Sequence, residues 1–86
     1  MKITEINIIP IKPNGGLIGF ASVVLDNGLY LGSMGVYSRL DGTGYRITYP
    51  TKKVGDKDLN IYHPISRELG IAIEDAITGK ALELFG

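Results

Sequence analysis

The sequence predicts a small α+β domain over residues 1–86, in which an antiparallel sheet of four to five strands precedes one C-terminal helix. Two observations support this. Segments rich in β-branched residues, separated by glycine-containing turns, fill residues 3–49. After Pro64, apolar residues recur instead at spacings of three and four, the period of an amphipathic helix. Because the strands come before the helix and do not alternate with it, the order is typical of α+β proteins.

Residues 3–9, 17–25 and 29–37 are expected to form the first three strands. Pro10 cannot donate a ladder hydrogen bond, so the end of the first strand should lie at a sheet edge or a bulge. The Asp26-Asn27-Gly28 turn is the strongest hairpin signal, because Asn-Gly accepts the positive φ angles of a type I′ turn. The second and third strands should therefore be neighbours.

Gly32 and Gly35 lie within the expected third strand. Glycine in a strand interior indicates a bulge or a close approach of two backbones. Residues 45–49 should form a fourth strand that carries Arg46 on the face opposite its apolar side chains. A polar, charged loop is expected over residues 50–58, followed by a short extended piece over residues 59–63.

The helix is expected to begin after Ser66, a good N-cap residue, with Glu68 in its first turn. Gly79 weakens a helix by about 1 kcal/mol relative to alanine and is a candidate end point. The apolar stripe is expected to consist of Ile65, Leu69, Ile73, Ala76, Ile77 and Leu84. Ile71, Leu82 and Phe85 lie off this stripe, so we expect the helix to be covered on a second side.

The chain is short for a stable domain. Eighty-six residues bury only about 60–65% of the surface that the unfolded chain exposes. The sequence has no cysteine and only one histidine, His63, which excludes disulfides and argues against a structural zinc site or other metal cofactor. Oligomerisation is the remaining way to stabilise so small a domain, and we expect a homodimer.

The charge is balanced overall but unevenly distributed. Nine basic and nine acidic residues give a net charge of zero, which argues against a strongly basic nucleic-acid binder. Residues 39–58 carry five bases and three acids, whereas residues 59–86 carry two bases and four acids. A basic middle and an acidic end fit either ordinary surface charge or a binding site, and both interpretations stay open at this point.

The sequence is poor in catalytic residues, and we expect neither an enzyme nor a small-molecule substrate. There is no cysteine nucleophile, and His63 precedes a proline. Glu74 and Asp75 are adjacent, so their side chains would point in different directions on a helix. No apolar run is long enough for a membrane span, and residues 1–5 show no signal peptide, so we expect a cytoplasmic protein without membrane contact.

Tyr49-Pro50-Thr51-Lys52-Lys53 is the notable surface motif. It stands where the chain leaves the expected fourth strand. Two ammonium groups and a threonine hydroxyl at this point could contact phosphates. The alternative is a charged loop that only keeps the protein soluble.

Three stretches in this order resemble the SpoVG family, the bacterial septation and sporulation regulators. The first is Ala-Ser-Val-Val-Leu-Asp at residues 21–26, and the second is the lysine motif at residues 49–53. The third is Ile-Tyr-His-Pro-Ile at residues 61–65, followed by Ile-Glu-Asp-Ala-Ile at residues 73–77. The resemblance implies a small antiparallel sheet with a C-terminal helix, a homodimer, and site-tolerant binding of DNA and RNA in gene regulation.

The resemblance also implies which residues bind. The family's basic residues after the fourth strand correspond to Lys52 and Lys53, with Thr51 adding a hydroxyl or backbone contact. The family's helix-start arginine aligns with Gly70, and the nearest base is Arg67. Arg46 and Arg67 are expected to extend the basic surface. The alternative function is a protein-interaction module of the same fold that recruits a protein through exposed strand edges and does not bind nucleic acid.

Overall fold

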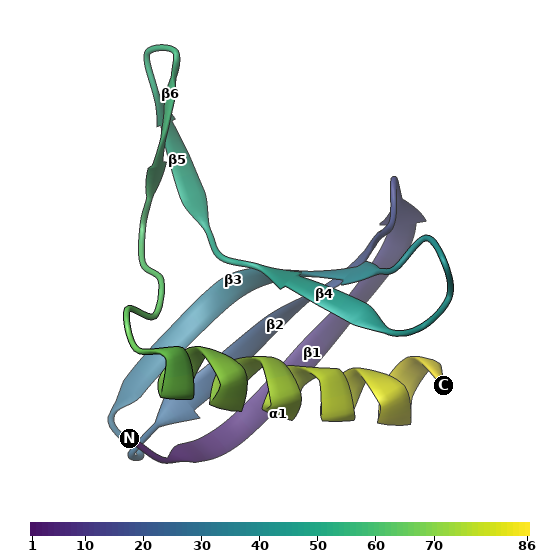
Figure 1. Ribbon diagram of the computed structural model, residues 1–86, viewed down its shortest axis with the longest axis horizontal. Coiled ribbons are helices and arrows are strands. Elements are labelled where there is room, and N and C mark those ends of the chain that lie inside the picture. The colour runs from purple at the N-terminus through teal and green to yellow at the C-terminus, as the bar shows by residue number, and fades with distance from the viewer.

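A computed structural model describes residues 1–86. The chain forms a four-stranded antiparallel sheet, a separate two-stranded hairpin and one helix, which confirms the α+β class. The helix lies across one face of the sheet, and the hairpin projects away from both (Figure 1). In chain order the elements are β1 (Ile3–Asn14), β2 (Leu17–Leu25), β3 (Leu29–Ser38), β4 (Tyr45–Thr48), β5 (Thr51–Val54), β6 (Lys57–Asn60) and α1 (Arg67–Phe85).

The large sheet is a meander in the order β1-β2-β3-β4, so every strand pairs with its sequence neighbours. β1 continues through Pro10 to Asn14, five residues beyond the end expected from the sequence. Pro10 is tolerated because β1 is an edge strand, where a missing N–H need not break a ladder bond. The expected irregularity is present as a register shift between Pro10 and Asn14.

The turn between β2 and β3 forms where the sequence predicts it. Asp26 and Asn27 have positive φ angles of 50° and 55°, as the central residues of a type I′ turn require. The Gly28 N–H donates to the Leu25 carbonyl oxygen at 2.9 Å. The positive φ angles thus fall one residue earlier than the expected Asn-Gly pair.

Both glycines of β3 mark the irregularities that the sequence predicts. The pairing of β2 with β3 shifts between Ala21 and Val23, and Ser33, beside Gly32, has a φ of 62°. A Cβ on Gly35 would lie 2.6 Å from the Thr48 hydroxyl oxygen on β4. Gly32 therefore adjoins a bulge, and Gly35 allows β3 and β4 to approach closely.

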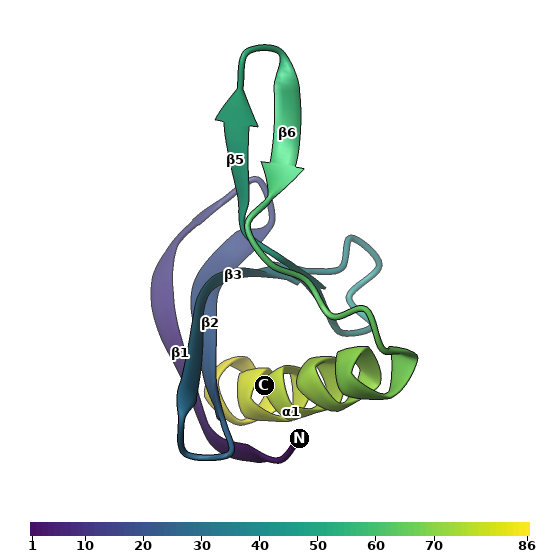
Figure 2. The ribbon, with the colours of Figure 1, turned by 90° about the vertical axis from the view of Figure 1, so that its left-hand side faces the viewer.

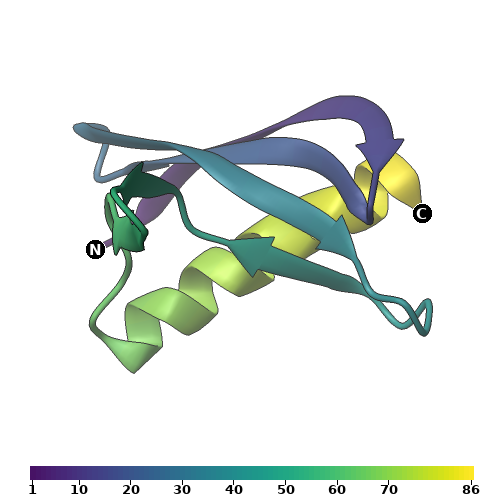
Figure 3. The ribbon, with the colours of Figure 1, turned by 90° about the horizontal axis from the view of Figure 1, so that it is seen from above.

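The core is a single layer between α1 and the sheet face that it covers, here called the inner face. α1 runs obliquely to the strands (Figure 3). Pairs such as Ile8–Ala21 and Val36–Ile47 are buried on this face. The ten core residues are Ile8, Ala21, Val23, Leu25, Met34, Val36, Ile47, Ile73, Ile77 and Ala81. No element covers the opposite, outer face of β1, β2 and β3 (Figure 2).

α1 begins where the sequence predicts. The Leu69 N–H donates to the Ser66 side-chain oxygen at 3.1 Å, which confirms the N-cap. Gly79 does not end the helix, because it lies inside a continuous span of 19 residues. No helix in the structure is long and apolar enough to cross a membrane.

The buried stripe of α1 differs at its ends from the expected one. Ile73 and Ile77 are buried as predicted, and Ala81 continues the stripe one turn later. Ile65 is wrongly assigned to the stripe: it precedes the N-cap and is 94% exposed. Leu84 is also wrongly assigned to the stripe: it lies in the last turn of the helix and is 48% exposed.

Residues 50–58 do not form the expected loop. β5 and β6 pair with each other through a two-residue turn in which Gly55 has a φ of 65°, as the first central residue of a type II′ turn requires. Every hairpin residue is exposed. The hairpin stands clear of the sheet and the helix in two perpendicular views (Figures 1 and 2). Lys52 and Lys53 are therefore strand residues.

Replacing Ile73 with alanine should lower the free energy of unfolding by about 2–5 kcal/mol, because the side chain is buried between α1 and the sheet. Ile71→Ala is the matched control on the same helix. Ile71 is 45% exposed, so its loss should be below about 1 kcal/mol. Urea unfolding of both variants measures the difference. Equal losses would contradict the assigned inner face.

Candidate nucleic-acid interface

The register of the hairpin assigns its side chains to two faces. The cross-strand pairs are Thr51–Asn60, Lys52–Leu59, Lys53–Asp58 and Val54–Lys57. Directly paired residues share a face, and successive residues of a strand alternate between faces. Lys52 and Lys53 therefore point to opposite faces of the hairpin. We call the face with Lys52, Val54, Lys57 and Leu59 the lysine face, and that with Thr51, Lys53, Asp58 and Asn60 the mixed face.

The two faces differ in charge. The lysine face carries two ammonium groups and no carboxylate. On the mixed face Lys53 lies directly opposite Asp58, and cross-strand partners have Cβ atoms about 4.5–5.5 Å apart. The carboxylate therefore offsets the charge of Lys53. Lys57 is absent from the residues chosen from the sequence, although the Gly55-Asp56 turn signal between two short polar segments could have identified its strand.

The base of the hairpin is attached to the sheet by polar and aromatic contacts. The Ile61 N–H donates to the Pro50 carbonyl oxygen at 3.0 Å and closes the hairpin. The Tyr62 hydroxyl donates to the Gly32 carbonyl oxygen on β3. The rings of Tyr62 and Tyr49 pack edge to face, with centroids 6.2 Å apart. These contacts fix the point from which the lysines extend.

Burial also shifts the pKa values of these two tyrosines. It raises the pKa of Tyr62 to about 12, with smaller contributions from Tyr49 and Tyr30. Burial raises the pKa of Tyr49 too, and the Glu74 carboxylate adds to this effect. The Tyr49 hydroxyl is buried without a hydrogen-bond partner. Both side chains are therefore neutral phenols at physiological pH.

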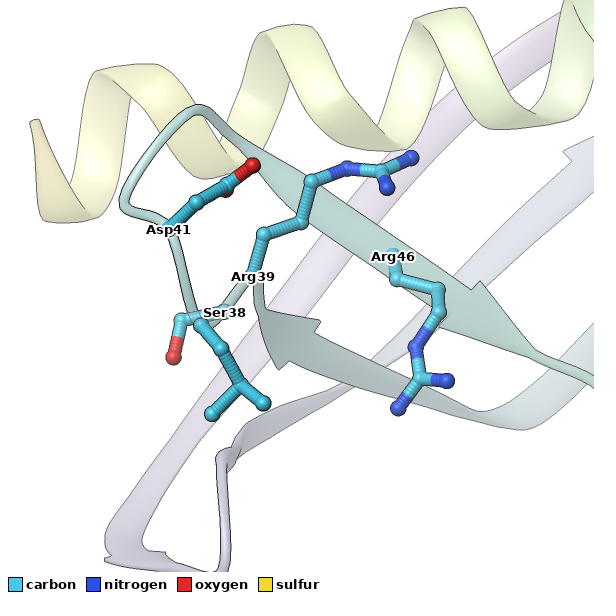
Figure 4. Close-up of a pocket in the computed structure, with 5 residues that line it drawn as sticks. Ser38, Arg39, Asp41 and Arg46 are labelled. Atoms are coloured by element: carbon cyan, nitrogen blue, oxygen red, sulfur yellow. The ribbon is translucent and has the colours of Figure 1, made fainter.

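Arg46 lies outside the hairpin, on the outer face of the sheet. Its guanidinium carbon is 5.1 Å from the ring centroid of Tyr37, its cross-strand partner. Arg46 and Arg39 line a shallow depression of about 320 Å³ at the end of β3 (Figure 4). Asp41 also lines it, and hydrogen bonds from the Thr43 hydroxyl and N–H lower the pKa of that carboxyl. The depression therefore keeps one negative charge beside two positive ones.

Arg67 is exposed at the first position of α1, the helix that covers the inner face. Gly70 follows one turn later, where a Cβ would contact the Pro64 ring at 3.6 Å. The structure brings Thr51, Lys52 and Lys53 together on one strand. Arg46 belongs to β4 and Arg67 to α1, so neither is part of the hairpin. No three His, Cys, Asp or Glu side chains gather to hold a metal ion.

A four-stranded meander covered by one helix, with a lysine-bearing hairpin at its margin, defines a small α+β protein whose most exposed charged element is a β-ribbon. The sequence model of the SpoVG family matches residues 1–81. The chain therefore belongs to the SpoVG family, which confirms the resemblance carried by its three motifs.

Two relatives carry the name septation protein SpoVG. The one from Archaeoglobus fulgidus is 32% identical over 78 residues, which cover 88% of this chain and 88% of the relative. The one from Staphylococcus saprophyticus is 28% identical over 78 residues, which cover 90% of this chain and 75% of the relative. Both similarities extend over most of the fold.

Replacing Tyr62 with phenylalanine should lower the free energy of unfolding by about 0.5–1.5 kcal/mol, because the Gly32 carbonyl loses its donor. The raised pKa adds a pH dependence. The folded chain keeps the phenol proton to higher pH than the unfolded chain. Its stabilisation is therefore complete below about pH 10 and lost as the pH rises towards 12.

The difference in unfolding free energy between the parent and Tyr62→Phe, measured by urea unfolding, should consequently shrink between pH 9 and pH 12. Taking this difference cancels the lysines that titrate in the same range. A constant difference across the range would show that the Tyr62 phenol has the same pKa in both states.

Proposed function

We propose that this protein is a regulator that binds DNA and/or RNA as a homodimer, within the septation, sporulation or gene regulation attributed to its family. The observation that carries the proposal is the free-standing hairpin with its exposed lysines. Membership of the SpoVG family and the names of the two relatives support it. In this proposal the protein acts in the cytoplasm by binding alone, without a cofactor, a small-molecule substrate or catalysis.

The binding chemistry is contact with phosphates. A lysine ammonium is a compact point charge on a flexible stem, which suits phosphates better than base edges. Lys52 and Lys53 supply such charges, and Thr51 beside them adds a hydroxyl. Arg46 and Arg67 extend the contact from the outer face and from the start of α1. Recognition of this kind depends little on sequence and strongly on salt.

A homodimer would display two hairpins, so a chain without net charge could still present two basic sites to one nucleic acid. Exposed apolar residues offer two surfaces for a second copy. One is the outer face of the sheet, with Ile9, Phe20 and Tyr30. The other is the exposed side of α1, with Ile71, Leu82 and Phe85. Either surface would leave the hairpin free.

The second candidate function is a protein-interaction module that does not bind nucleic acid. The free edges of β1 and β4 favour it, because an unpaired strand edge can accept a strand from a partner. Pro10 and Pro13 make β1 the poorer of the two edges, since neither can donate to an added strand. A protein partner would therefore add to β4.

Changing Lys52 and Lys53 together to alanine should weaken binding equally for unrelated DNA and RNA sequences. Each lost phosphate contact lowers the slope of log affinity against log salt by about 0.9 on duplex DNA. The slope of a dimer should flatten by about 2 if one lysine per subunit makes a contact, and by about 4 if both do. Fluorescence anisotropy across a salt series measures affinity and slope.

Lys2→Ala with Lys12→Ala is the matched control, because it removes the same charge at and beside β1, away from the hairpin. It should bind as the parent does. Unchanged affinity and slope in the Lys52/Lys53 variant would exclude the phosphate contacts. A parent protein that binds neither DNA nor RNA at low salt would favour the protein-interaction module.

Sedimentation at micromolar concentration should give about twice the 9.3 kDa mass of the chain, because the fold has no disulfide and buries one thin core. Replacing Phe20 on the outer face or Leu82 on α1 with a charged residue should identify the surface that mediates assembly. A parent protein of monomer mass at this concentration would exclude the stable dimer.

A further inference from the structure

We propose that the lysine face of the hairpin is the phosphate-binding surface, so that Lys57 is a binding residue and Lys53 is not. This inference rests on the proposed function and changes its residues. Lys52 and Lys53 are neighbours in sequence, yet the strand alternation turns them to opposite faces of the hairpin. One ligand surface laid against the hairpin can meet only one of them face on.

Lys52 and Lys57 occupy diagonal positions on the lysine face. Lys52 pairs with Leu59, and Lys57 lies two residues before Leu59 on the same strand. Diagonal neighbours of this kind are about 7–8 Å apart. One strand of duplex DNA carries a charge about every 3.4 Å along the axis, so flexible lysine side chains that start from positions this far apart can reach separate phosphates of one strand. Each lysine can therefore contact a phosphate of its own.

The charges around the two faces favour the lysine face. Lys52 and Lys57 share it with no carboxylate. None of the three hairpin lysines forms an ion pair, so, as regards carboxylates, the faces differ only in the position of Asp58. Asp56 is in the turn rather than on either strand. Asp58 lies across from Lys53, where it would repel a phosphate that approaches this lysine. Binding on the lysine face therefore brings a phosphate to two cations without an opposing carboxylate.

Val54 and Leu59 occupy the other diagonal of the lysine face, and each is 51% exposed. Nothing in the fold covers them, because β5 and β6 pair only with each other. Together with the two lysines, they form a checkerboard of apolar and charged side chains on this face. Lysine stems also lie readily along apolar surface while the ammonium group stays in water. The apolar pair can thus orient the two charges outward.

Lys52→Gln, Lys57→Gln and Lys53→Gln in the full chain test the assignment, because all three remove one charge from the same hairpin. The probe is a duplex DNA of mixed sequence, titrated by fluorescence anisotropy from low salt to 0.3 M. Lys52→Gln and Lys57→Gln should each flatten the salt slope by about 0.9 per contacting subunit, which is roughly an 8-fold or greater loss at 0.1 M salt. Lys53→Gln should stay within about twofold of the parent, since it makes no phosphate contact.

Lys57→Arg keeps the charge and should bind like the parent. Thermal unfolding checks that each variant folds, and all four substitutions lie on exposed positions. If the parent binds DNA, while Lys57→Gln binds equally well and Lys53→Gln is weakened, the assignment is wrong and the proposed function stands. If the parent does not bind at low salt, the proposed function fails and the assignment fails with it.

Discussion

Burial of one side of α1 on the inner face of the sheet is the constraint on which the rest of the structure depends. Ile73, Ile77 and Ala81 complete a core of only ten residues. A meander alone would leave both of its faces in water, and most of the stability of a helix in a protein comes from packing its apolar side. The hairpin adds no residue to this core. Its position therefore depends on two hydrogen bonds at its base. The Tyr62 hydroxyl donates to the Gly32 carbonyl oxygen on β3, and the Ile61 N–H donates to the Pro50 carbonyl oxygen.

The sequence predicts the elements whose signals are local. β2 has the expected bounds, and Ser66 caps α1 as expected. The errors arise where the tertiary arrangement decides. Pro10 indicates an edge strand or a bulge, but the pairing that carries β1 on to Asn14 depends on its neighbour β2, which a single sequence does not reveal. Ile65 has the spacing of the buried stripe, but the cap at Ser66 leaves it outside the helix and in water.

The candidate site is predictable in composition but not in geometry. The lysine motif and the family resemblance identify Lys52 and Lys53 as exposed bases, and both are exposed. The sequence of β5, the strand that carries them, shows no hydrophobic alternation. No hairpin side chain is buried, so none needs to be apolar. Only the register set by the Gly55 turn separates Lys52 from Lys53 and joins Lys52 to Lys57.

A hairpin that shares no buried residue with the core is free to change during evolution. Substitutions at its exposed positions alter the folding free energy little, typically within about 0.5 kcal/mol. Selection on stability therefore acts mainly on the sheet and α1, while selection on ligand preference can act on the ribbon separately. Proteins with this architecture can exchange the charges of one short segment and acquire a different partner without rebuilding their scaffold.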